Sequence, residues 1–262
     1  MVKRIANPGS ALGEAIGSLL EAEVHRLLRP VAEEYNAIYI TTPQQVGAQR
    51  KKLILTDEDG NEYEVDAVIV NNRFQPLVLL ESKYIRYKKH NRDKASWICT
   101  AHTKLRQRFP TIRDSIAVLM GSWSEPSKKL LQSFAVTTFE IPFERICEVL
   151  RQFGINYAWA EKEREAAMEA WEKFNLLCEA DKTQIAKKLI GEIAPKLREA
   201  LAKALDESVP RQVRKVSILI STNRGETFTF TFNSVKQAVS FMSKFNAKRC
   251  LDTSKAPTIR MR

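Results

Sequence analysis

The sequence predicts a mixed α/β protein, with a central sheet flanked by helices, then a helical segment, then a small hairpin-and-helix unit. Over about the first 155 residues, short apolar runs rich in β-branched side chains alternate with amphipathic helical stretches. Residues 156–206 have helical character throughout, and a hairpin followed by an amphipathic helix comes after them. We therefore divide the chain into residues 1–155, 156–209 and 210–262.

The composition is that of a soluble globular protein, with 44% hydrophobic and 28% charged residues in a chain of 262. No apolar run approaches the ~18 residues of a membrane helix, and the N-terminus leads into no hydrophobic signal segment. The four cysteines are scattered without a C-x-x-C pair, which predicts reduced thiols and not a zinc site. We expect a cytoplasmic protein with no membrane partner.

The first helix is expected over residues 11–35, where apolar side chains recur at helical spacing in one stripe. Pro30 lies in its interior and predicts a kink or a break. A strand over 52–56 and a solvated turn over 57–61 follow.

Residues 62–83 predict a β-hairpin, because two apolar runs rich in β-branched residues flank a polar loop that ends at Pro76. Side chains on a strand alternate between faces, so Glu81 and Lys83 point the same way. With Asp66 on the same side of the first strand, one face of the hairpin collects three charged groups.

The register of this hairpin sets two acids against each other. If the strands fold symmetrically about the loop, paired positions sum to 147, which places Asp66 opposite Glu81. Opposed like charges destabilise a strand pair, and burial increases the penalty. A divalent cation between the carboxylates removes the repulsion, and oxygen ligands suit Mg²⁺. Lys83 would then lie beside the metal, able to orient a water or to stabilise phosphate charge.

The alternative is a polar residue on a half-exposed strand together with a solvated pair, Glu81 and Lys83, at a strand end. Against this, charge directly follows the apolar run 77–80, where the core pattern predicts another apolar residue. Such local violations favour a functional site.

Asp66, fourteen intervening residues and then Glu81-Ser82-Lys83 resemble the motif of the PD-(D/E)xK nuclease superfamily, which includes many restriction endonucleases, Holliday-junction resolvases and homing and repair nucleases. The resemblance implies a restriction-endonuclease-like central mixed β-sheet over the first 155 residues. It maps the metal-binding acids onto Asp66 and Glu81 and the catalytic lysine onto Lys83, with the Ser82 carbonyl assisting the metal. Val65 stands where the motif has proline, a position that varies in the family.

In the resembled family an N-terminal helix often adds a third acid to the site. Gly17 to Glu21 is similar to the G-x-x-x-E pattern of resolvase-like members, which favours Glu21. A helical wheel keeps Glu23 open, because it falls inside the apolar stripe whereas Glu21 lies on the flank. That neither acid joins the site is the third possibility.

Basic residues follow the motif, since residues 84–113 hold nine Lys and Arg against one acid. A basic patch next to the site predicts a polyanionic partner bound through its phosphates. The alternative is a solvated basic face. The expected phosphate contacts are Arg86, Lys88, Lys89 and Arg92.

Alternating elements complete the first 155 residues. They are expected as a helix over 93–109, a strand over 115–121, a helix over 125–133, a strand over 134–141 and a helix over 142–153. His102 and Lys104 lie on the first of these helices, but a lone histidine is more often structural, so neither is assigned to the site.

The C-terminal part is basic, with sixteen Lys and Arg against six acids over residues 183–262. Its hairpin, within 213–232, has a phenylalanine face that the following helix is expected to cover with Val235, Val239, Met242 and Phe245. The other face offers Thr227 and Thr229 beside Arg224, and a two-stranded ribbon can enter a DNA major groove. A dimerisation or scaffold module fits the pattern equally well.

Together these observations predict a Mg²⁺-dependent endonuclease that acts on double-stranded DNA, with Mn²⁺ as a possible substitute, most like a type II restriction endonuclease. A Holliday-junction resolvase or a homing or repair nuclease is the alternative on the same core. A DNA-binding protein that keeps the fold without catalysis is the alternative outside enzymes. A homodimer would suit cleavage of both strands at a palindrome.

Overall fold

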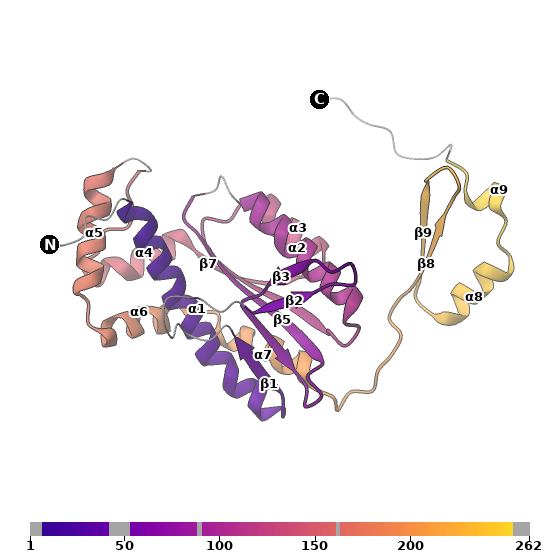
Figure 1. Ribbon diagram of the computed structural model, residues 1–262, viewed down its shortest axis with the longest axis horizontal. Coiled ribbons are helices and arrows are strands. Elements are labelled where there is room, and N and C mark those ends of the chain that lie inside the picture. The colour runs from indigo at the N-terminus through magenta and orange to yellow at the C-terminus, as the bar shows by residue number, and fades with distance from the viewer. Residues whose placement is uncertain (1–6, 42–52, 88–90, 161–162, 254–262) are drawn as a thin grey trace. The chain divides into compact units, whose positions relative to one another are not determined.

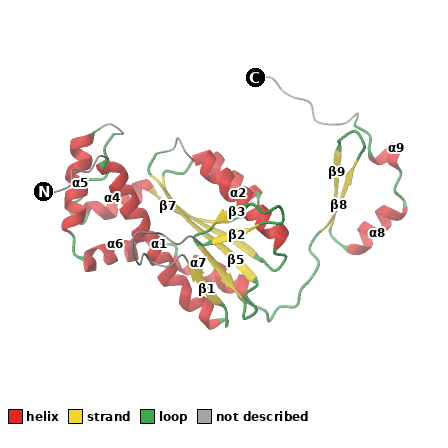
Figure 2. Ribbon diagram, viewed as in Figure 1, coloured by secondary structure: helices red, strands yellow, loops and turns green. Residues whose placement is uncertain are grey.

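A computed structural model describes residues 7–41, 53–87, 91–160 and 163–253 (Figure 1). The chain divides into two compact units, Met1–Asp206 and Glu207–Arg262, and each is described by itself. The first unit contains a five-stranded mixed sheet with helices on both faces and a separate two-stranded sheet (Figure 2). The prediction of an α/β fold is therefore confirmed.

The central sheet has the strand order β1-β4-β5-β6-β7. Its antiparallel half joins β1 to β4 and β4 to β5, and its parallel half joins β5 to β6 and β6 to β7. The strand bounds are β1 Ile38–Thr41, β4 Ala67–Val70, β5 Pro76–Ile85, β6 Asp114–Gly121 and β7 Thr137–Pro142. Strand β5 is the middle strand, and most of its side chains are buried.

Helices cover both faces of this sheet. On one face, α1 Pro8–Glu34, α4 Phe143–Arg151 and α7 Ala194–Leu205 contact the sheet, and α5 Arg164–Leu176 and α6 Glu179–Gly191 pack on α1 in the same core. The other packs against α2 Asn91–Arg108, α3 Glu125–Ser133 and a small hairpin of β2 Ile54–Thr56 and β3 Glu62–Glu64. No helix within the described ranges has the length and apolar character to cross a bilayer.

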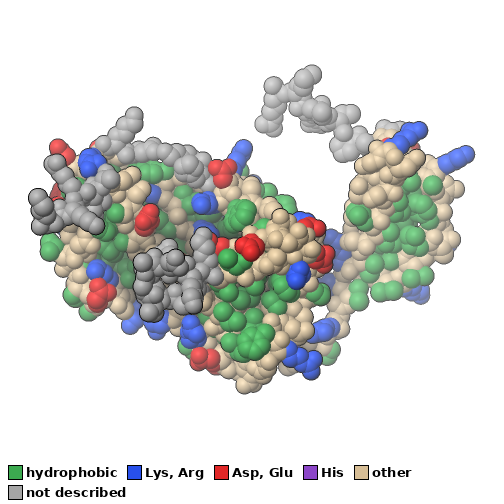
Figure 3. Space-filling view, viewed as in Figure 1, with side chains coloured by type: hydrophobic (Ala, Val, Ile, Leu, Met, Phe, Trp, Pro, Cys, Tyr) green, Lys and Arg blue, Asp and Glu red, His purple; other side chains and the backbone are tan. Residues whose placement is uncertain are grey.

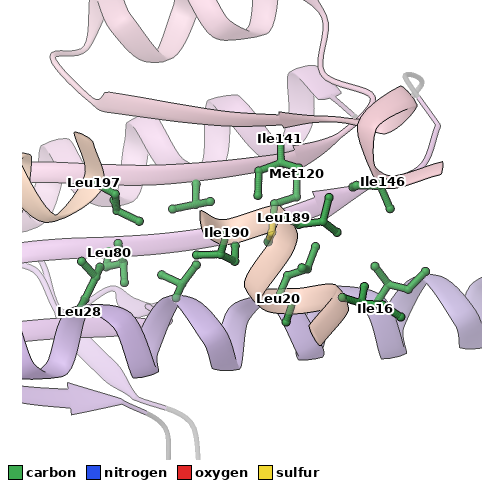
Figure 4. Close-up of a cluster of buried hydrophobic side chains, with 14 of the residues drawn as sticks. Ile16, Leu20, Leu28, Leu80, Met120, Ile141, Ile146, Leu189, Ile190 and Leu197 are labelled. Carbon is green, nitrogen blue, oxygen red and sulfur yellow. The ribbon is translucent and has the colours of Figure 1, made fainter. Parts of the chain in front are cut away.

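Helix α1 forms as its sequence predicts. The Asn7 side chain accepts a hydrogen bond from the Ser10 N–H at 3.1 Å and caps the helix. A stripe that includes Ile16, Leu20 and Leu28 is fully buried against the sheet and against α6 and α7 (Figure 4). Pro30 does not break the helix, because it removes only one intrahelical hydrogen bond near the C-terminal end.

Two glycines allow close approaches that position the end of β5. A Cβ at Gly17 of α1 would lie 3.2 Å from the Tyr84 Cβ. Gly121, at φ 92°, ends β6 where a Cβ would lie 2.1 Å from the Ile85 carbonyl oxygen. A side chain at Gly17 would therefore force Tyr84 to shift by a few tenths of an ångström, so Gly17 has a packing role whatever the role of Glu21.

The first half of the sheet differs from the prediction in three respects. The expected strand over 62–70 is two strands, because β3 pairs with β2 while β4 pairs with β1 and β5. The edge strand β1, only four residues long, was not predicted. The turn after β2 is not simply solvated, because the Asp57 side chain is buried in it and accepts hydrogen bonds.

The helical stretch after residue 155 belongs to the first unit. Residues 156–160 are not helical, and α5, α6 and α7 are separate helices that pack on α1 in the same hydrophobic core as the sheet. Up to Asp206, the helical segment expected as a separate part over 156–209 therefore belongs to the first unit. The sequence shows that these helices have short apolar stripes, but it does not show against which surface the stripes pack.

The second unit contains a hairpin of β8 Val216–Ser221 and β9 Thr227–Phe232, then α8 Val235–Ser243 and α9 Ala247–Cys250. Phe241 packs on Phe230 and Phe232, with ring centroids 4.6 and 5.1 Å apart. The expected covering residues Val235, Val239 and Met242 are instead exposed. The helix is rotated so that the large Phe241 ring fills the space over the hairpin, and hydrophobic side chains remain visible on this unit (Figure 3).

Candidate active site

The register of the β4–β5 hairpin agrees with the prediction. Ala67 pairs with Leu80, and the next two residue pairs keep the same register before an irregularity at Ile69/Val70. Asp66 lies in a bend one position before β4. Continuing the register by one step sets Asp66 beside Glu81, at the point where β4 and β5 separate.

The three charged side chains of this hairpin converge. Lys83 Nζ lies 3.0 Å from both carboxylate oxygens of Asp66 and 2.7 Å from Glu81 Oε2. Both acids therefore direct oxygen atoms at one position, and the lysine ammonium occupies it. The site lies on the sheet face that carries α2. Val68 is two positions from Asp66 and Leu79 is two positions from Glu81, so these side chains share a face, and both pack in the hydrophobic cluster under α2.

The backbone of Ser82 adds to the same region. Its N–H donates a hydrogen bond to Asp66 Oδ2 at 2.7 Å. The N–H and C=O of a strand residue point to the same side, so the Ser82 carbonyl is also directed past the end of β4 toward Asp66. This is the carbonyl expected to assist a metal.

Burial makes the charges of the site interact strongly. Side-chain exposure is 2% for Glu81, 15% for Asp66 and 28% for Lys83. Burial, and then repulsion from Glu81, raises the pKa of Asp66 to about 7, although Lys83 and the Ser82 N–H oppose the rise.

The other two groups of the site stay charged. Burial alone would lower the pKa of Lys83, but the two carboxylates outweigh it and raise that pKa above the ordinary value. Burial alone would raise the pKa of Glu81, but contacts with His102 and Lys83 lower it. The metal-free site therefore holds a charged lysine between an ionised Glu81 and an Asp66 that is easily protonated.

The donor set fits a hard divalent cation. The buried Glu81 Oε2 accepts no hydrogen bond of good geometry from any described residue, and the ammonium beside it shows that a cation is tolerated there. In the described ranges, no three His, Cys, Asp or Glu side chains form a metal-binding group. Two carboxylates still suffice for Mg²⁺, which usually takes its other ligands from waters, a carbonyl such as that of Ser82 and substrate phosphate.

The two acids of α1, Glu21 and Glu23, have different surroundings. Glu23 is buried and accepts hydrogen bonds of 2.6 Å from Arg26 Nε and Nη2. Glu21 is partly exposed, lies 3.4 Å from His25 Nε2, and its negative charge contributes to the raised pKa of Asp66. The charge of Glu21 thus reaches Asp66, while Glu23 is held by Arg26, and the choice of Glu21 as third acid stays a prediction.

The residues expected to contact phosphates differ in their exposure to solvent. Arg86 is only 9% exposed, with its guanidinium carbon 3.9 Å from the Trp159 ring centroid and 4.2 Å from that of Tyr157. Its expected contact with DNA is therefore wrong, because the side chain is packed between aromatic rings from a later segment. Lys88 and Lys89 lie outside the described residues.

The remaining expected contacts are on surfaces. Arg92 is exposed near the start of α2. In the second unit, Thr227 and Thr229 are exposed on the face of β9 opposite the phenylalanines, and Arg224 is exposed in the turn of the hairpin. These side chains are accessible to a partner.

His102 on α2 was not assigned to the site from the sequence. It is 1% exposed, and its Nε2 lies 3.8 Å from Glu81 Oε1. The sequence did contain a signal, because His102 falls in the buried stripe of α2 between Ile98 and Leu105. A histidine on the apolar face of the helix that follows the motif is directed at the sheet and not at solvent.

Comparisons with known proteins leave the family open. No family model matches the sequence, and no curated protein matches it. The crystal structure of AF1548, a protein of unknown function, aligns with 71% of this chain and 98% of that chain, at 14% identity and a TM-score of 0.31. A likeness at this level carries no argument about fold or activity.

Proposed function

We propose that this protein is a Mg²⁺-dependent DNA endonuclease that hydrolyses phosphodiester bonds in double-stranded DNA at specific sequences, as a type II restriction endonuclease does. The observation that supports it is the convergence of Asp66 and Glu81 on one cation position, with Lys83 beside them. Buried acids that face each other destabilise a fold unless a cation lies between them, so a non-catalytic sheet gains nothing from this arrangement.

Each residue has a chemical task in this proposal. Asp66, Glu81 and the Ser82 carbonyl would hold the metal, and Glu21 would complete the acidic side of the site. Mg²⁺ held there would supply Lewis acidity. The Lys83 ammonium, which lies within 3.0 Å of both carboxylates, would give up this position to the metal and, from beside it, would hold the attacking water or stabilise charge on the phosphate.

The charge of the chain supports a nucleic acid as substrate. The net charge is +11, and exposed Lys and Arg side chains are spread over the visible face of the first unit (Figure 3). Positive charge favours a polyanion through release of counterions. The exposed hydroxyl face of the second unit, with Thr227, Thr229 and Arg224, would supply contacts with base edges.

The test is a digest of long unmethylated duplex DNA by purified protein, with Mg²⁺, with Mn²⁺ and with EDTA, read by sequencing the DNA ends. We expect metal-dependent ends that share a short sequence, and no cleavage by folded Asp66→Ala or Glu81→Gln. Glu23→Gln is the control, because Glu23 is held by Arg26 away from the site. Cleavage by folded Asp66→Ala at the parent rate would falsify the assignment.

Substrate tests separate the alternatives. A resolvase would leave linear duplex intact and cut four-way junctions, and a repair nuclease would cut flaps or damaged DNA. A homodimer would suit cleavage of both strands at a palindrome. Sedimentation of the protein alone and with duplex DNA that carries the cleavage sequence tests for it. Binding of DNA without cleavage of any of these substrates would favour the non-catalytic alternative.

A further inference from the structure

His102 is a buried imidazole next to the site, and nothing in the proposed chemistry uses it. It is 1% exposed on α2, and Nε2 lies 3.8 Å from Glu81 Oε1. No described residue forms a hydrogen bond with Nδ1 or Nε2. The polar side chain that lies against this ring is thus the carboxylate of Glu81.

A purely structural role does not account for this side chain. A buried polar atom without a partner destabilises a fold, so a leucine of similar bulk would pack at this position with less penalty. The neighbours of His102 in the buried stripe of α2, including Ile98 and Leu105, are apolar. The imidazole therefore indicates an interaction that involves its nitrogen atoms.

Glu81 is the group that gains from such an interaction. Its Oε2 contacts Lys83 Nζ at 2.7 Å, while Oε1 faces His102. A carboxylate that binds a metal through one oxygen is commonly held in orientation by a hydrogen bond to the other. The 3.8 Å separation is longer than a hydrogen bond, and an approach of about 1 Å would bring the two atoms within hydrogen-bond distance.

We propose that His102 is a positioning residue that donates a hydrogen bond from Nε2–H to Glu81 Oε1 and so presents Glu81 Oε2 to the cation. The inference rests on the proposed metal site, although we expect the hydrogen bond to form without metal as well. In this arrangement His102 contacts neither metal nor DNA. Its effect reaches the reaction only through the orientation of Glu81.

The first test detects the hydrogen bond in metal-free, full-length protein by long-range ¹H–¹⁵N NMR of the histidine rings. The chain has three histidines, so the His102 signal is assigned by its loss in His102→Gln. We expect an Nε2–H resonance protected from exchange with water, which shifts in Glu81→Gln and not in Glu23→Gln. A His102 ring signal that is unprotected, or that Glu81→Gln leaves in place, overturns the inference.

The second test measures Mn²⁺ binding by calorimetry on the same variants, after thermal unfolding has shown that each is folded. His102→Leu removes the donor at similar bulk, and we expect affinity to fall about tenfold or more. His102→Gln keeps a donor, and we expect it to recover most of that loss. Affinity equal to that of the parent in His102→Leu contradicts the inference and leaves the proposed function standing.

The two tests distinguish the inference from the proposed function. If the parent protein binds no Mn²⁺, the metal site is wrong, and the NMR result still decides whether His102 holds Glu81. If the parent binds Mn²⁺ and both His102 variants lose affinity equally, a donor is not what matters, and the inference fails.

Discussion

Two carboxylates of the first unit, the buried Asp57 and the partly buried Asp66, lie close together in the sequence, and their pKa values are shifted in opposite directions. Asp57, in the turn between β2 and β3, is 1% exposed and accepts four hydrogen bonds, of 2.8–3.0 Å. Burial alone would raise its pKa, but these donors from Asn61, Tyr63 and Asp59 lower it to about 2. Asp57 is ionised and fully satisfied.

Asp66 accepts one backbone N–H and shares the Lys83 ammonium with Glu81. Its pKa is raised to about 7 because burial and the facing carboxylate outweigh these partners. The comparison teaches that burial alone does not mark a functional acid. A structural carboxylate is surrounded by neutral donors, whereas Asp66 is left to depend on a cation.

The largest expected effect comes from removing that cation. Lys83→Met leaves two buried acids facing each other, and we expect a loss of ~3–5 kcal/mol in the free energy of unfolding in EDTA. The loss should be smaller at lower pH, where Asp66 takes up a proton, and Mg²⁺ should restore part of it. Urea unfolding with EDTA and with Mg²⁺ measures both.

Lys104→Met is the matched control for this experiment. Lys104 also pairs with an aspartate, Asp59, at 2.7 Å, but both side chains are exposed to solvent. We expect almost no change in stability, because solvent screens an exposed ion pair. Equal losses in the free energy of unfolding for Lys83→Met and Lys104→Met would contradict the claim that Lys83 offsets the repulsion between Asp66 and Glu81.

The next effect concerns pH. Between the ordinary pKa of about 3.9 and the folded value of about 7, the folded protein binds more protons than the unfolded chain at Asp66, so its stability falls as pH rises. Asp66→Asn removes this dependence. In EDTA, we expect the variant to gain on the parent by at most roughly 4 kcal/mol between about pH 4 and pH 8. A gain that does not change with pH would mean that Asp66 titrates normally.

A smaller effect distinguishes the acids of α1. Glu21→Gln should lower the cleavage rate about tenfold, which is ~1.4 kcal/mol in the barrier, because the proposed site takes Glu21 as its third acid. Glu23→Gln should leave the rate unchanged, since Arg26 already holds that carboxylate. Single-turnover rates on one DNA substrate compare the two. The reverse ranking would move the third acid to Glu23.

The smallest effect is expected at the satisfied carboxylate. The lowered pKa of Asp57 means that its stabilising contribution is present above pH ~4 and is lost as pH falls toward about 2. Asp57→Asn should therefore reduce stability near neutral pH, with the difference vanishing in acid, and should leave metal binding intact. Thermal unfolding across this pH range is the measurement. Loss of metal binding in Asp57→Asn would contradict this comparison, because Asp57 would then also contribute to the metal site.

Local features of the site were predictable from the sequence. The β4–β5 hairpin is set by alternation and by loop length, both of which act between residues close in the chain, so its register and the shared face of Asp66, Glu81 and Lys83 followed. The helix order after the hairpin followed from similar local periodicity.

Features that depend on distant contacts were not predictable. Arg86 looked like a surface cation, but Trp159, which packs on it, lies 73 positions later. The rotation of α8 depends on how the Phe241 ring fits the hairpin. His102 meets Glu81 only because α2 folds back over β5, which periodicity suggests and cannot prove.

The most direct test of the central claim is Mn²⁺ binding by calorimetry at about pH 8, where Asp66 is largely ionised, on the parent, Asp66→Asn and Asp57→Asn. The account predicts that the parent and Asp57→Asn bind Mn²⁺ and that folded Asp66→Asn does not. Binding by Asp66→Asn at the affinity of the parent, or no binding by the parent, would contradict it.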